Sequence, residues 1–135
     1  MVKFSIFSKF GGISPDSEIY SFERKMTKIL DELTESVSSE AQLQFHIEFR
    51  VDGDFLQFGD PNGCSNLRFY KKKNLAAITI ALSCDLLKSG IDIGEYIEEQ
   101  FRSAIEKMID RVMKDKIEIN KPFIMEKLDS RIEKW

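Results

Sequence analysis

Residues 43–51 alternate apolar and polar side chains without a break, and no other pattern in the chain constrains the fold as strongly. Successive side chains of a β-strand point to opposite faces, so this pattern predicts a strand with one buried and one exposed face. The apolar positions are Leu43, Phe45, Ile47, Phe49 and Val51, and the polar positions are Gln44, His46, Glu48 and Arg50. We therefore expect a sheet that is covered by helices on one side and polar on the other.

Four further segments are predicted to be strands from similar patterns. The first begins at Val2 and ends before Gly11-Gly12, and the dipeptide Asp52-Gly53 favours a tight hairpin. The remaining strands are residues 54–58, 67–72 and 75–83. The last of these is apolar on both faces, which is typical of an internal strand. Together the segments after residue 43 predict an antiparallel meander.

Apolar residues recur every three or four positions in three segments, which predicts helices with one apolar side. The first helix is expected to start at Ser14-Pro15-Asp16. The second should start at Asp92, where Glu95 completes a capping box, and the third should carry Pro122 in its first turn. The predicted order is β-α-β-β-β-β-α-α. This order describes a single α+β domain over residues 1–135, with an antiparallel sheet of about five strands packed against helices.

Charge and cysteine content narrow the functional classes. The 135 residues contain 20 Lys and Arg against 23 Asp and Glu, a net charge of −3. This mild and scattered charge argues against nucleic acid as a partner, because phosphate binding needs clustered cations, and Lys71-Lys72-Lys73 is expected at a hairpin tip. The apolar stretch 75–82 is far shorter than the roughly 20 residues of a membrane helix. Cys64 and Cys84 are expected to be reduced thiols of a cytoplasmic protein.

Residues that carry catalysis or bind metals are sparse in this sequence. His46 is the single histidine, and no Ser or Cys nucleophile lies near it in the chain. Two cysteines separated by nineteen residues match no zinc spacing. The loop 59–64 lacks both the Lys-Ser ending and the following helix of a phosphate-binding loop. We therefore predict no catalytic residue, no metal, no cofactor and no membrane partner, and a protein that acts by binding another protein.

The layout of the chain resembles the small immunity proteins of bacterial polymorphic toxin and contact-dependent growth inhibition systems. The resemblance rests on the opening Met1–Gly12 (MVKFSIFSKFGG), the first helix, the alternating segment 43–51 and the long charged final helices. It implies a cytoplasmic, non-enzymatic protein that neutralises a cognate toxin domain by blocking its active site or an adjacent surface. Because the resemblance concerns overall layout, it assigns no individual residue.

The polar face of the predicted sheet is the expected binding surface. Arginine and aromatic residues anchor many protein interfaces, which bury on the order of 800 Å² per partner. The acidic residues of this face are expected to meet basic groups of the toxin. The predicted partner-binding residues are His46, Glu48, Arg50, Asp52, Asp54, Arg68 and Tyr70.

Two other functions stay open from sequence. A secretion or assembly chaperone would hold its partner in an exposed apolar groove, often as a dimer, and the sequence permits a monomer or a dimer. A small enzyme or ligand-binding domain would need an interior pocket with converging polar groups. The distribution of exposed apolar residues and the filling of the interior distinguish these functions.

Overall fold

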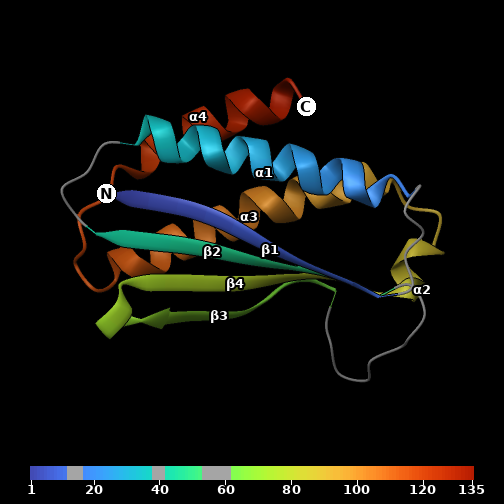
Figure 1. The fold of residues 1–135 in the computed structure, drawn as a ribbon, viewed down its shortest axis with the longest axis horizontal. Helices are drawn as coiled ribbons and strands as arrows, with labels where there is room; N and C mark the ends of the chain where they lie inside the picture. The colour runs from blue at the N-terminus through green and yellow to red at the C-terminus, as the bar shows by residue number, and fades with distance from the viewer. Residues whose placement is uncertain (12–16, 38–41, 53–61) are drawn as a thin grey trace.

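The structure is a computed structural model that describes residues 1–11, 17–37, 42–52 and 62–135 (Figure 1). In chain order its elements are β1 (Val2–Gly11), α1 (Ile19–Ser36), β2 (Leu43–Asp52), β3 (Gly63–Tyr70), the short 3-10 helix η1 (Lys71–Lys73), β4 (Leu75–Leu82), α2 (Cys84–Leu87), α3 (Ile93–Met113) and α4 (Lys121–Glu133). The strands form one sheet in the order β1-β2-β4-β3. The predicted α+β class is confirmed.

The sheet is mixed, and the prediction of an antiparallel sheet is wrong. β1 pairs with β2 in parallel, β2 pairs with β4 in parallel, and β3 pairs with β4 antiparallel. α1 returns the chain from the end of β1 to the start of β2, and such a crossover is what parallel pairing requires. β4 lies between β2 and β3, whereas the predicted meander would place the segment 75–83 beside 67–72 and away from 43–51.

Several predicted strand boundaries change in the structure. The predicted strand 54–58 and the hairpin turn before it lie outside the described residues. The predicted strand 67–72 is observed as β3, which starts at Gly63 and gives way to η1 after Tyr70. Asn74 then takes a left-handed conformation with φ of 49° and turns the chain into β4. β4 is internal to the sheet, as predicted.

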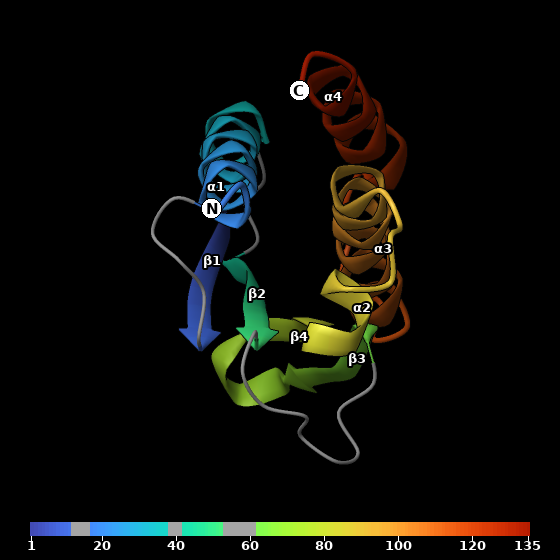
Figure 2. The same cartoon turned by 90° about the vertical axis from the view of Figure 1, so that its right-hand side faces the viewer.

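The long helices lie on one side of the sheet (Figure 2). α1 packs on β1, α3 packs on β3 and β4, and α4 packs on α1 and α3. The helix start predicted at residues 14–16 lies outside the described residues, and α1 begins at Ile19. The Asp92 side chain caps α3 by accepting a hydrogen bond from the Glu95 backbone N–H at 3.1 Å, as predicted. Pro122 lies in the first turn of α4, also as predicted.

One apolar core fills the space between the helices and the sheet. β2 contributes the alternating residues that the sequence singled out, and α3 contributes a fully buried apolar side. Burying a side chain of this kind stabilises the fold by about 1.5–3 kcal/mol. The largest buried side chains include Phe4, Phe45, Phe49 and Phe101. The core therefore fixes which side of each strand faces the helices.

Exchange of Phe49 for alanine is expected to lower the free energy of unfolding by about 3–5 kcal/mol, because it leaves a cavity in the core. Phe7, on the neighbouring strand, is 59% exposed, and Phe7→Ala should change that free energy by less than about 0.5 kcal/mol. Urea unfolding followed by circular dichroism measures both variants. Equal losses in the two variants would contradict the assignment of strand faces.

Candidate functional site

The described helices leave one face of the sheet uncovered (Figure 2). All four strands contribute outward side chains to this face. Strand register places these side chains in rows across the sheet. We call this surface the open face. Its described side chains are Lys3, Ser5, Phe7 and Lys9 on β1, Gln44, His46, Glu48 and Arg50 on β2, Leu75, Ala77, Thr79 and Ala81 on β4, and Ser65, Arg68 and Tyr70 on β3.

The open face contains most of the predicted binding residues. His46, Glu48 and Arg50 lie on β2, and Arg68 and Tyr70 lie on β3. They face each other across β4 instead of lying on adjacent strands. The predicted residue Asp54 lies outside the described residues, and only the backbone of Asp52 is described, as the last residue of β2.

An ion pair crosses the middle of the open face. Arg68 Nη2 lies 3.7 Å from Glu48 Oε2, and Arg68 Nη1 donates a hydrogen bond to the Asn66 carbonyl at 2.7 Å. Because the two charged residues belong to β2 and β3, the pair bridges β4. Beneath it, β4 contributes the small side chains of Ala77 and Thr79, which are 3% and 5% exposed. The pair therefore brings the two long side chains together over β4.

A hydrogen bond fixes His46 on the same face. Its Nδ1 atom lies 2.9 Å from the hydroxyl of Ser5, so the contact joins β1 to β2. Burial lowers the pKa of His46 below its ordinary value of 6.5; the Glu48 charge raises this pKa and the Arg68 charge lowers it. The imidazole is therefore mainly neutral at pH 7, with a ring orientation set by Ser5.

The open face also contains an exposed aromatic residue that the sequence prediction left out. Phe7 lies beside Glu48 in the register of β1 and β2, and it is 59% exposed. The two-residue alternation of β1 identifies Phe7 as an outward-facing residue. Phe7 lies an odd number of positions from the buried residues Val2 and Phe4, so it is on the opposite face of the strand. It lies two positions from the polar residue Ser5 and shares its face.

Cys64, which the sequence places in the loop 59–64, lies on the inner face of β3 against α3. Its backbone N–H donates to Gln100 Oε1 at 3.1 Å, and its thiol donates to the Gln100 carbonyl at 3.2 Å. Burial raises the pKa of the Cys64 thiol, while the Lys107 charge and a hydrogen bond with Ser103 lower it. A thiol with a raised pKa is a weak nucleophile at neutral pH, so Cys64 contributes to packing.

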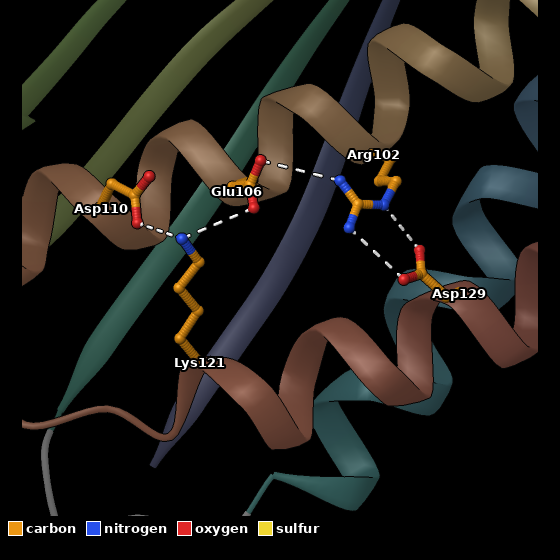
Figure 3. Close-up of polar contacts among 5 residues, drawn as sticks. All are labelled: Arg102, Glu106, Asp110, Lys121 and Asp129. Atoms are coloured by element: carbon orange, nitrogen blue, oxygen red, sulfur yellow. Dashed lines mark hydrogen bonds and ion pairs between the residues drawn. The ribbon is translucent and has the colours of Figure 1, made fainter.

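Another dense group of charges lies between α3 and α4 (Figure 3). Arg102 makes two hydrogen bonds to Asp129, at 2.8 and 3.4 Å, and these raise the pKa of Arg102. Lys121 Nζ lies 2.7 Å from Asp110 and 3.5 Å from Glu106, and the hydrogen bond to Asp110 raises the pKa of Lys121. Each side chain in the group contacts one of opposite charge. The group therefore links α4 to α3.

The interior and the exposed apolar residues distinguish the alternative functions. Thr79 is the one buried polar residue in the described part, and the buried indole N–H of Trp135 has no hydrogen-bond partner there. The described interior thus lacks the converging polar groups that a ligand pocket needs. Large apolar side chains that are exposed come from several separate elements: Met1, Phe7, Leu67, Tyr70, Ile91, Met113 and Phe123.

Neither a metal-binding cluster nor a membrane-spanning helix is found among the described residues. No group of three or more His, Cys, Asp or Glu side chains among them is placed to hold a metal ion. None of their helices is long and apolar enough to cross a membrane.

Comparison of the chain with protein-family models, with curated proteins and with solved structures finds no match in any of the three.

The pKa of His46 tests the geometry of the open face. NMR titration of this single histidine is expected to give a pKa below 6.5, because burial disfavours the charged ring. Arg68→Gln should raise the pKa, since it removes a cation, and Glu48→Gln should lower it. Shifts in the opposite directions would contradict the placement of these two residues beside the imidazole.

The lowered pKa of His46 also makes the free energy of unfolding depend on pH. The lowered pKa in the folded state means that the unfolded chain binds the proton first as pH falls. The contribution of His46 to the free energy of unfolding is thus complete above the unfolded pKa of about 6.5 and decreases as pH falls through it. Urea unfolding between pH 8 and pH 5 should show this decrease in the parent chain, and His46→Gln should remove that component.

Proposed function

We propose that this chain is a non-enzymatic protein-binding module of the immunity type. In this proposal the open face docks on a cognate bacterial toxin domain in the cytoplasm and blocks its active site or an adjacent surface. The observation that carries the proposal is the open face itself. It is a continuous four-stranded surface, free of described helices, on which charged and aromatic side chains lie side by side.

The rigidity of the open face supports docking without rearrangement. The contact between Ser5 and His46 joins β1 to β2, and the ion pair between Glu48 and Arg68 joins β2 to β3. The strands beneath are hydrogen-bonded to one another and packed on the core. A surface that is ordered before binding loses less conformational entropy in the complex, and therefore binds more tightly for the same contacts.

The open face offers suitable anchors at its two edges. Phe7 on β1 is 59% exposed and Tyr70 on β3 is 47% exposed. Aromatic residues such as these contribute a large share of the binding energy in many interfaces. Between the two edge strands lie the polar side chains of β2 and the mostly small side chains of β4, so the anchors stand beside polar groups.

The identity of the partner is inferred from the sequence. The opening MVKFSIFSKFGG, the first helix and the charged final helices resemble small immunity proteins in layout. The apolar, filled interior favours action through the surface over recognition of a small ligand. A chaperone is less well supported, because the exposed apolar side chains are spread over several elements.

The proposal is tested with the C-terminal domain of a large secreted protein encoded beside this chain. Expression of that domain alone should arrest bacterial growth, and co-expression of this chain should restore it. The two proteins should co-purify as a complex on gel filtration. Continued growth arrest without a complex, or the lack of such a neighbouring gene, would contradict the proposal.

The double variant Phe7→Ala/Tyr70→Ala should weaken binding of the toxin domain by at least about 30-fold, measured by calorimetry, because two anchors are lost. Phe123→Ala is the matched control, since Phe123 is 37% exposed on α4, in the helical layer. It should leave affinity unchanged. A loss of affinity in the control alone would show that the toxin binds the helices instead.

A further inference from the structure

The open face differs in charge from the chain as a whole. The full chain carries a net charge of −3. The described side chains of the open face comprise four cations and one carboxylate, Glu48. The cations are Lys3, Lys9, Arg50 and Arg68. Among the described side chains of the surface proposed to bind the partner, cations therefore outnumber carboxylates, although the net charge of the chain is negative.

The positive character is concentrated on β1. Glu48 and Arg68 compensate each other at 3.7 Å, in the middle of the sheet. Lys3 and Lys9 are exposed, and none of the ion pairs among the described residues involves either of them. They are six residues apart on one strand, a span of roughly 20 Å, and the exposed Phe7 lies between them.

We infer that the open face binds an acidic protein surface whose carboxylates lie on either side of an apolar depression that receives Phe7. In the proposed function this partner is a toxin domain. The inference rests on that function and adds the chemistry of the toxin surface that is bound. Complementary charge would steer the encounter and set the orientation of β1 on the partner. The sequence predicts that the acidic residues of this face meet basic groups of the partner. We infer an acidic partner surface instead, because Glu48 is already paired with Arg68.

The same features disfavour a second copy of this chain as the occupant. Face-to-face contact of two open faces would bring two positive surfaces together. Pairing of two β1 edges about Ile6, in antiparallel fashion, would place Lys3 of each copy beside Lys9 of the other. Like charges directly opposite in a sheet are destabilising. The two lysines thus protect an edge strand from self-association.

Nucleic acid is also disfavoured by the geometry. Proteins that bind single strands stack successive bases on neighbouring aromatic side chains. Phe7 and Tyr70 lie on the opposite edge strands β1 and β3, so they are separated by roughly 14 Å across the sheet. Two successive bases cannot stack on both.

The inference is tested by NMR titration of the isotope-labelled full chain with three probes. These are a ten-residue peptide of glutamates around a central leucine pair, its counterpart with lysine at each glutamate, and a uridine decamer. The acidic peptide should shift the amide signals of Lys3, Phe7 and Lys9 and leave α4 unchanged. Shifts of these signals by the lysine peptide instead, or tighter binding of the uridine decamer, would overturn the inference.

Charge reversal then separates this inference from the proposed function. Lys3→Glu/Lys9→Glu should weaken both the acidic peptide and the toxin domain by about tenfold or more. Lys28→Glu/Lys134→Glu changes net charge equally at exposed positions of the helical layer and should have little effect. Toxin binding that is insensitive to the first variant would overturn the inference and leave the proposed function standing. A chain that binds the acidic peptide but not the toxin domain would overturn the proposed function alone.

Discussion

The apolar side of α3 determines which face of the sheet remains available for binding. Its core residues are fully buried against β3 and β4: Ile97, Phe101, Ala104, Ile105, Met108, Ile109 and Val112. α1 covers β1 in the same layer, and α4 packs on both helices from outside. Since the burial of these side chains stabilises the fold, the polar residues of each strand have to point away from the helices. The binding properties of the molecule thus follow from its core packing.

The position of β4 determines how the open face is composed. Its outward residues Ala77 and Thr79 are small, so longer side chains on β2 and β3 can meet above them. This is how Glu48 and Arg68 form an ion pair although one strand separates them. The centre of the face is therefore compensated in charge, and the uncompensated lysines lie toward β1. A sheet with β2 and β3 as neighbours would distribute these charges differently.

Local features of the structure were predictable from the sequence, whereas strand pairing was not. The alternation of residues 43–51 identified the buried and exposed sides of β2, because it depends only on the two-residue period of a strand. The cap at Asp92 was likewise local. Alternation does not record strand direction or neighbours, and the parallel pairing of β2 with β1 and β4 depends on crossovers between distant segments.

The errors at the site have similar physical causes. Gly63 looks like a turn residue in sequence, yet it begins β3 with φ of 87°. This left-handed conformation favours glycine, since residues with a side chain rarely adopt it, and a Cβ atom there would also come within 2.7 Å of Gln100 Oε1. Cys64, the next residue, is partly buried against the core. An aromatic residue in an apolar strand is usually part of the core, and Phe7, which is 59% exposed, departs from this tendency.

Hydroxyl-radical footprinting of the chain, alone and in complex with the toxin domain, tests most directly whether the open face is the binding surface. The method reports the solvent exposure of individual aromatic and methionine side chains. Oxidation of Phe7 and Tyr70 should decrease strongly in the complex, whereas Met113 and Phe123, which are exposed on α3 and α4, should react as before. Protection of Met113 and Phe123 with unchanged oxidation of Phe7 and Tyr70 would contradict this account.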